Sequence, residues 1–277
     1  MDKKVLYVSD LDGTLMRNDL TISEYSVKTI NELISQGLAF TYATARSIES
    51  AREITGELKI TLPVVTRNGA VLADNVTGAH LEKAVFADKE IIKIKELIPE
   101  ITYFGFVSCF IGDKMIKAYA DTDHSEGLSG YIGYYVNDPR MVKVENMEGM
   151  FTGNPGYVTL IGSKKELEPV FERVSAYDGW ESMFQKDTYR DEYWIEICPK
   201  NCTKAKSILK LKEEYGFEKL VVFGDSLNDV SMFKAADEAY AVSNAYEELK
   251  SFATAVIGSN EEDSVAAFIK NRFEGIV

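Results

Sequence analysis

Two carboxylates that directly follow a short buried strand constrain this chain more than any other stretch. Residues 5–8 are apolar and rich in β-forming side chains, which predicts a buried strand. Asp10 and Asp12 come next, and Gly13 permits the turn that ends the strand. Open α/β sheets bind ligands at the carboxyl ends of their strands. Two acids this close repel each other unless a cation neutralises them, and Mg2+ is the usual cation beside phosphate. An acidic turn without a ligand is the plainer alternative.

A second stretch repeats the pattern of strand, glycine and carboxylates. Residues 219–223 predict another apolar strand, and Gly224, Asp225, Asn228 and Asp229 follow it. Alone, this pattern is equally typical of an ordinary helix N-terminus. Two acidic strand tips on one parallel sheet are what a shared metal site requires, so the pair favours a site formed by Asp10, Asp12, Asp225 and Asp229.

Two further residues belong with these tips. Residues 38–43 predict a second strand, joined to the first through a helix, so the two strands are expected to be parallel with Thr44 beside Asp10. Lys204 begins a helix predicted over residues 203–215. The helix dipole disfavours a cation there, so this lysine suggests a nearby anion, although a solvent-exposed lysine is the alternative.

The order of the elements predicts two domains within 277 residues. Residues 1–84 and 190–277 are expected to form a Rossmann-like α/β core with a parallel sheet, and the strand at 193–197 is assigned to it. Residues 85–189, where helices alternate with aromatic-rich strands, are expected to form an inserted α/β cap domain. Glycine, asparagine, aspartate and proline cluster in residues 137–156, which predicts a long surface excursion.

Composition limits the compartment and the partners. The net charge of −13 opposes binding to nucleic acid and to anionic membranes. We find no apolar run long enough to span a bilayer and no secretory segment. Cys109, Cys198 and Cys202 lack a zinc-ligand pattern and are interpreted as reduced thiols. These features predict a cytoplasmic protein that binds neither nucleic acid nor membranes, and they leave the oligomeric state open.

Together, and in this order, the motifs resemble the haloacid dehalogenase superfamily of phosphohydrolases. The long insert resembles the α/β cap of its Cof-type sugar-phosphate phosphatase branch. The matching stretches are Asp10-Leu11-Asp12-Gly13-Thr14, Thr44, Arg67-Asn68-Gly69-Ala70, Lys204, Gly224-Asp225-Ser226-Leu227-Asn228-Asp229, Ser243-Asn244-Ala245 and Asn260-Glu261-Glu262-Asp263-Ser264-Val265. One departure is Ala45, where that branch usually has glycine; it adds a methyl group close to the expected phosphate pocket.

The resemblance implies a role for each site residue. Asp10 is the expected nucleophile that forms an aspartyl-phosphate, and Asp12 is the expected general acid and base. The implied Mg2+ ligands are the Asp10 carboxylate, the Asp12 main-chain carbonyl and Asp225, with Asp229 supporting them through water or through Lys204. The expected contacts to the phosphoryl oxygens are Thr44, Lys204 and Asn228. The weaker candidates for contacts to the cap or the leaving group are Arg46, Asn68 and Arg190.

The sequence therefore predicts a Mg2+-dependent phosphatase for small phosphorylated metabolites. A transport ATPase or a dehalogenase would lack the second acid, so Asp12 argues against both. A phosphomutase on sugar phosphates would keep it and remains an alternative. A catalytically silent regulatory protein that binds such a metabolite is the other alternative, and the intact set of acids and Lys204 argues against it. The sequence does not identify the substrate.

Overall fold

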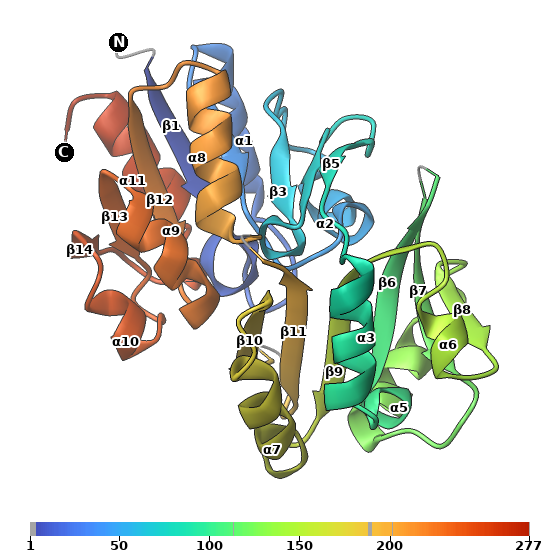
Figure 1. The fold of residues 1–277 in the computed structure, drawn as a ribbon. Helices are drawn as coiled ribbons and strands as arrows, with labels where there is room; N and C mark the ends of the chain where they lie inside the picture. Colours follow the sequence, from blue (N-terminus) through green and yellow to red (C-terminus); the bar gives the residue numbers. More distant parts are fainter. Residues whose placement is uncertain (1–3, 113, 188–189, 201, 277) are drawn as a thin grey trace. The chain divides into compact units, whose positions relative to one another are not determined.

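The computed structural model describes residues 4–112, 114–187, 190–200 and 202–276. The chain forms two compact units (Figure 1). The first unit contains residues 1–82 and 203–277, and the second contains residues 83–202. Each unit has its own main sheet, so each is described separately.

The first unit is built on a five-stranded parallel sheet in the order β14-β13-β12-β1-β2. Its strands are β1 (Val5–Ser9), β2 (Ala39–Tyr42), β12 (Lys219–Gly224), β13 (Glu238–Ala241) and β14 (Ala255–Val256). The central strands β1 and β12 are buried apart from their first residues, which is why both read as continuous apolar runs.

Helices cover both faces of this sheet. They are α1 (Glu24–Ser35), α2 (Ile48–Thr55), α8 (Lys204–Glu214), α9 (Val230–Ala235), α10 (Glu247–Lys250) and α11 (Ser264–Phe273). Right-handed crossovers that lead in opposite directions place α1 and α9 on opposite faces. In agreement, α1 packs against α11 and α8 packs against α9. Helix α9 also contacts β12, and α1 contacts β2.

Short turns and a small hairpin sheet complete the first unit. The turns are η1 (Leu11–Leu15), η2 (Arg67–Gly69), η3 (Leu227–Asp229) and η4 (Asn260–Glu262). The hairpin strands are β3 (Val64–Thr66), β4 (Val71–Ala73) and β5 (His80–Lys83), and together they form a three-stranded sheet. An isolated parallel bridge between Ala43 and Val65 ties this sheet to the end of β2.

The second unit is built on a six-stranded mixed sheet in the order β10-β11-β9-β6-β7-β8. Its strands are β6 (Gly105–Ile111), β7 (Lys114–Ala120), β8 (Met141–Val144), β9 (Asn154–Gly162), β10 (Trp180–Lys186) and β11 (Tyr193–Pro199). Its helices are α3 (Asp88–Leu97), α4 (Ile101–Phe104), α5 (Glu126–Tyr134), α6 (Met147–Met150) and α7 (Lys164–Ser175).

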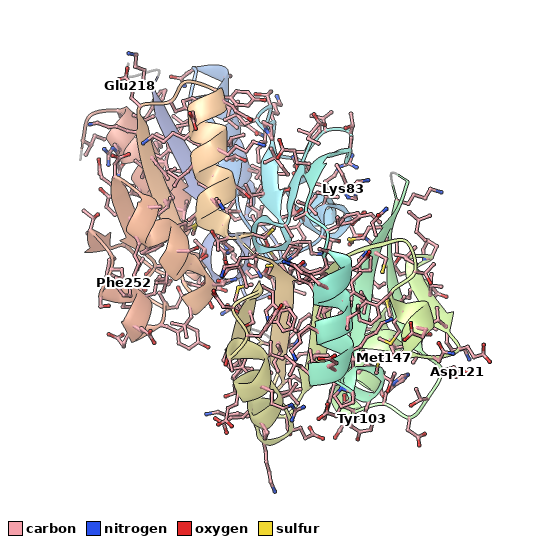
Figure 2. The ribbon with its side chains drawn as sticks, in the orientation of Figure 1. Lys83, Tyr103, Asp121, Met147, Glu218 and Phe252 are labelled. Carbon is pink, nitrogen blue, oxygen red and sulfur yellow. The ribbon has the colours of Figure 1, made fainter. Side chains whose placement is uncertain are left out.

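Alternating side chains divide the core of this unit between the two faces of its sheet. Val107, Val158 and Ile195 belong to the larger buried cluster, which includes apolar residues of α3 and α7. Phe106 and Ile161 belong to a smaller cluster with two residues of α5. Tyr103, labelled in Figure 2, lies in α4. Its ring packs edge-on against the ring of Phe104, with the ring centroids 4.8 Å apart.

The predicted fold class, an α/β protein with a parallel-sheet core, is confirmed by the first unit. Two local expectations are wrong. The strand at 193–197 does not join the core with the rest of residues 190–277, since β11 pairs with β9 and β10, and Ile195 and Ile197 complete the buried face of the second unit. Residues 137–156 are not one long excursion, since they contain β8, α6 and the start of β9.

Among the described residues, no helix combines the length and the apolar character needed to cross a bilayer.

Candidate active site

The candidate site lies where the connections of the parallel sheet change direction. Strand β1 leads through α1 to β2 on one side, and β12 leads through α9 to β13 on the other. Ligands of open α/β sheets bind at this switch point, outside the carboxyl ends of the strands. Asp10 follows β1, and its N–H donates to the Phe223 carbonyl of β12 at 2.9 Å. Asp225 follows β12, so the two predicted acidic tips are neighbours.

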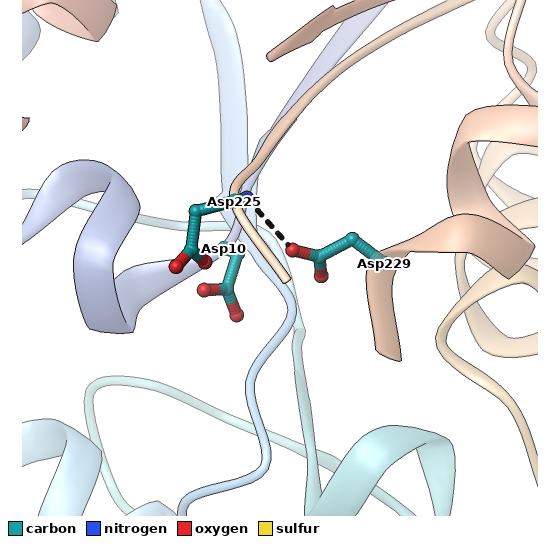
Figure 3. Close-up of side chains that lie close together, drawn as sticks. All are labelled: Asp10, Asp225 and Asp229. Carbon is teal, nitrogen blue, oxygen red and sulfur yellow. Dashed lines mark hydrogen bonds between the residues drawn. The ribbon is translucent and has the colours of Figure 1, made fainter. Parts of the chain in front are cut away.

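Three carboxylates converge at this point (Figure 3). Asp10, Asp225 and Asp229 each present one oxygen, and these oxygens lie within 4.8 Å of one another. All three residues are buried. The Asp229 Oδ2 accepts hydrogen bonds from the Asp225 N–H at 3.0 Å and from the Ser226 N–H at 3.1 Å, so the backbone directly before η3 holds this carboxylate in place.

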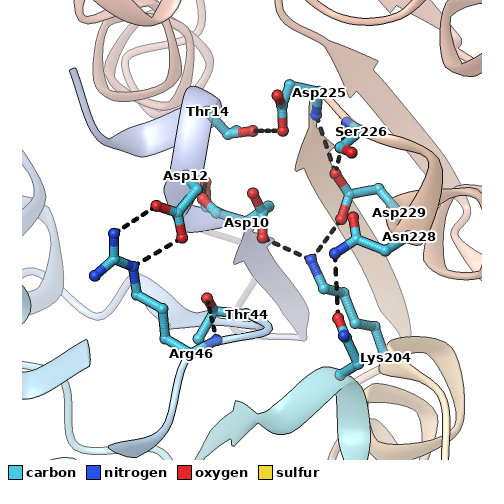
Figure 4. Close-up of polar contacts among 12 residues, drawn as sticks. Asp10, Asp12, Thr14, Thr44, Arg46, Lys204, Asp225, Ser226, Asn228 and Asp229 are labelled. Atoms are coloured by element: carbon cyan, nitrogen blue, oxygen red, sulfur yellow. Dashed lines mark hydrogen bonds and ion pairs between the residues drawn. The ribbon is translucent and has the colours of Figure 1, made fainter. Parts of the chain in front are cut away.

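Lys204 is the cation of this cluster. It is the first residue of α8, and its side chain is fully buried. Its Nζ donates to Asp10 Oδ1 at 2.6 Å and to Asp229 Oδ1 at 2.7 Å (Figure 4). The anion suggested by a lysine in a first helical turn is therefore supplied, at least in part, by the protein's own carboxylates.

The charges of the cluster do not balance. Three carboxylates and one ammonium group leave two net negative charges when all are ionised. Burial raises the pKa of the Asp10 carboxyl to about 7, with the Asp229 and Asp12 carboxylates adding to the effect and Lys204 opposing it. Burial and the Asp10 and Asp229 carboxylates likewise raise the pKa of Asp225 well above its ordinary value. Burial lowers the pKa of Lys204, but Asp10 and Asp229 outweigh this and keep it above the ordinary value.

Two glycines allow the acidic tips to approach so closely. Gly13 has φ of 71°, and a Cβ on it would collide with Asp225 Oδ2. A Cβ on Gly224 would lie 2.6 Å from Asp229 Oδ2, closer than real Cβ atoms come. The glycine in each motif thus makes room for a carboxylate of the second motif.

Asp12 follows Asp10 by two positions, within η1, and its backbone is extended (φ −67°, ψ 123°). Its carboxylate is held by Arg46, a residue that the sequence analysis linked to the cap or the leaving group. Arg46 Nε donates to Asp12 Oδ2 at 2.8 Å, and Nη2 donates to Asp12 Oδ1 at 2.6 Å (Figure 4). The structure therefore pairs Arg46 with the expected acid and base.

Thr44 lies at the end of β2, as predicted, and its surroundings fix the loop after it. Its Oγ1 accepts from the Arg46 N–H at 3.1 Å, and its carbonyl accepts from the Asn68 N–H at 3.0 Å. Asn68 has φ of 52° within η2. Its side-chain oxygen accepts from Asn228 Nδ2 at 3.1 Å, while Asn228 Oδ1 is buried without a hydrogen-bond partner in the described part of the chain. Two predicted site residues thus meet.

Two other expectations concern Ala45 and Arg190. Ala45 is not among the described residues with a positive φ, so its backbone conformation suits alanine as well as glycine. The sequence analysis places Arg190 in the core, but in the structure this residue lies in the second unit. There it is exposed, and its guanidinium carbon lies 5.3 Å from the centre of the Tyr134 ring.

The structure adds three residues that received no role from the sequence. Thr14 Oγ1 donates to Asp225 Oδ1 at 3.2 Å, so the first motif also supports the second. Asn244 Nδ2 donates to the Gly13 carbonyl at 2.8 Å, and its side-chain oxygen accepts from the Asn260 N–H at 3.0 Å. All three residues lie in stretches that carried the family resemblance, which was the available signal for them.

The carboxylates fit a hard divalent cation. Such ions take oxygen ligands, and Mg2+ sites typically use one or two carboxylates while retaining waters. Asp10 and Asp225 offer oxygens within a common reach, and the two uncompensated charges match those of a divalent ion. Asp229 already accepts bonds from Lys204 and two backbone N–H groups, so it suits a supporting position better than a direct one.

Comparisons with known proteins agree with this geometry. The sequence profile of the haloacid dehalogenase-like hydrolases matches residues 7–269. The 5-amino-6-(5-phospho-D-ribitylamino)uracil phosphatase YwtE of Bacillus subtilis is 26% identical, over 96% of this chain and 97% of that protein. The pyridoxal phosphate phosphatase YbhA of Escherichia coli is 24% identical, over 94% and 95%.

Solved structures share the fold of this chain. A Thermotoga maritima protein superposes with a TM-score of 0.75 at 26% identity, covering 97% of each chain. A haloacid dehalogenase-like hydrolase from B. subtilis superposes with a TM-score of 0.77 at 20% identity, covering 96% of this chain and 99% of the other. The profile match spans nearly the whole chain and includes both acidic motifs. The chain therefore belongs to the haloacid dehalogenase-like hydrolases.

Proposed function

We propose that this protein is a Mg2+-dependent phosphatase that hydrolyses small phosphorylated metabolites through an aspartyl-phosphate on Asp10. The observation that carries the proposal is the buried Asp10 carboxylate, held by Lys204 at 2.6 Å beside a second acidic strand tip. The relatives named for their activity act on a phosphoribitylamino-uracil and on pyridoxal phosphate, two small phosphorylated molecules.

The proposed reaction has two steps, and Asp10 takes part in both. In the first step an Asp10 oxygen attacks phosphorus, the bond from phosphorus to the ester oxygen breaks, and Asp12 gives its proton to the departing alcohol. In the second step Asp12 takes a proton from water, the water oxygen attacks phosphorus, and the aspartyl bond breaks to release phosphate. Both residues return to their initial state.

Lys204 and the surrounding polar groups are proposed to stabilise the transferring group. The ammonium group of Lys204 would face the negative oxygens of the phosphoryl group while remaining bound to Asp229. Thr44 and Asn228 are proposed to contact the other phosphoryl oxygens. Mg2+, when bound by Asp10, Asp225 and the Asp12 carbonyl, would neutralise charge on these carboxylates and on the phosphate.

The second unit is proposed to govern which ester is accepted. The residues proposed for the two chemical steps all lie in the first unit, so the phosphoryl chemistry is common to every substrate. The choice among leaving groups is then left to residues 83–202, which correspond to the predicted cap. Changes at polar residues of this unit should re-rank substrates and leave the common steps intact.

Release of phosphate from an aryl phosphate and from a panel of phosphorylated metabolites, including the two named for the relatives, tests the proposal. Activity should require Mg2+, disappear with excess chelator and be absent from Asp10→Asn. A protein that hydrolyses esters equally well in chelator would contradict the metal assignment. Binding of a metabolite without turnover would instead support the silent regulatory alternative.

A further inference from the structure

Arg46 makes a two-point contact with the residue expected to move the proton. Its Nε and Nη2 reach different oxygens of Asp12, at 2.8 and 2.6 Å, in the parallel geometry that guanidinium and carboxylate groups favour. The pair is largely shielded, with 20% of the Arg46 side chain and 24% of the Asp12 side chain exposed. Two bonds fix both the position and the plane of the carboxylate, which a single bond would not do.

Arg46 is itself held from several directions. Its Nη1 donates to Ser50 Oγ at 3.2 Å, in the first turn of α2, and its backbone N–H donates to Thr44 Oγ1 at 3.1 Å. Its carbonyl accepts from the Arg67 N–H at 3.0 Å. The guanidinium therefore presents a fixed surface, and the orientation of Asp12 follows from the loop after β2.

We propose that Arg46 is a positioning residue that acts on the reaction through Asp12. This inference rests on the proposed phosphatase function, and it assigns Arg46 a task other than binding the leaving group. Orientation of an acid or base contributes strongly to rate, and a displacement of about 1 Å costs on the order of 100-fold. The effect of losing Arg46 should therefore appear only where the proton transfer by Asp12 matters.

Leaving-group dependence separates this role from a structural one. An alkyl phosphate needs a proton on its departing oxygen, whereas an aryl phosphate with a strongly acidic phenol does not. Arg46→Gln should lower kcat/KM for the alkyl ester by about 10- to 100-fold and change the activated aryl ester much less. Arg46→Lys, which cannot make the two-point contact, should fall between wild type and Arg46→Gln. Equal losses on both esters would overturn the proposal.

A double-mutant cycle provides the decisive measurement. Single-turnover rates with the alkyl ester are compared for wild type, Arg46→Gln, Asp12→Asn and the double variant, with Asp10→Asn setting the background. If Arg46 acts through Asp12, its substitution should have no further effect in Asp12→Asn. The same fold-loss in both backgrounds would refute the inference. Arg52→Gln, at an arginine of α2 that bonds the Val76 and Thr77 carbonyls, is the matched control and should retain full activity.

The two proposals fail separately. If wild type releases no phosphate, or Asp10→Asn remains active, the proposed function is wrong. If wild type behaves as proposed and the Arg46 and Asp12 effects are additive, only the positioning inference is wrong.

Discussion

Replacing Asp10 by asparagine should abolish activity yet stabilise the metal-free protein at neutral pH. Burial raises the pKa of the Asp10 carboxyl from its ordinary 3.8 to about 7, so the folded protein binds this proton more tightly than the unfolded chain does. Below about pH 4 the Asp10 carboxyl is protonated in both the folded and the unfolded state, so it does not lower the free energy of unfolding. As the pH rises towards 7 the unfolded chain loses the proton first, so folding becomes less favourable.

The size of the effect follows from that difference. Going from 3.8 to about 7 at about 1.4 kcal/mol per pKa unit gives an upper bound of about 4 kcal/mol. The asparagine of the variant has no proton to lose. In excess chelator at about pH 8, Asp10→Asn should thus have the higher free energy of unfolding, by an amount up to that bound, and the gain should fade towards about pH 4. Added Mg2+ should reduce this difference in the free energy of unfolding, because the ion stabilises the wild-type protein with Asp10 ionised.

Urea unfolding followed by circular dichroism measures this difference. Tryptophan fluorescence is less suitable, because both tryptophans, Trp180 and Trp194, lie in the second unit. Asp19→Asn is the matched control, since hydrogen bonds from Thr21 lower the pKa of that exposed carboxyl and no gain at high pH is expected. An Asp10→Asn protein that is no more stable than wild type at about pH 8, or whose gain grows towards about pH 4, would refute the reasoning.

Two substitutions test the buried cluster further. Lys204→Ala should depress kcat/KM by a similar large factor for several chemically distinct esters, because it removes charge stabilisation common to all of their transition states. The control Lys206→Ala, at an exposed lysine of the same helix, should leave kcat/KM unchanged. A changed ranking of the esters, with kcat/KM for the best one unchanged, would assign Lys204 to substrate recognition. Gly13→Ala should eliminate turnover, because the new Cβ would collide with the Asp225 carboxylate and because the φ of 71° at position 13 is strained for alanine. A fully active variant that binds Mg2+ with wild-type affinity would contradict the close approach of the two motifs.

Much of the first unit could be predicted because its strands and the turns after them are marked by local sequence patterns. The apolar runs at β1 and β12 and the Asp-Gly clusters after them identify parallel strands with acidic tips. Asp10 and Asp225 are then expected to lie close together, because the strands that precede them are parallel and belong to one sheet. The family resemblance offered Lys204 as one of two routes by which Asp229 supports the site, and the structure shows a bond between these two residues. The bond from Lys204 to Asp10 did not follow from the sequence, because a lysine in a first helical turn shows only that an anion is near.

The remaining errors also come from information that is not local. Strand β11 has the same alternation in either sheet, and only the burial of Ile195 and Ile197 with the second core decides its place. Arg46 follows Thr44 by two positions, but the direction of its long side chain depends on the loop conformation and on Ser50. Pairing with Asp12 across 34 positions of sequence could therefore not be derived from spacing.

Direct observation of the phosphorylated enzyme tests the central claim. Asp12→Asn, which retains the nucleophile and lacks the base for the second step, is mixed with Mg2+ and a reactive aryl phosphate, quenched in acid and measured by intact mass. We predict a mass increase of one phosphoryl group, located by peptide mapping on Asp10 and absent when Asp10 is also replaced by asparagine. A phosphoryl group on another residue, or wild-type turnover with no adduct in any variant, would contradict the aspartyl-phosphate scheme.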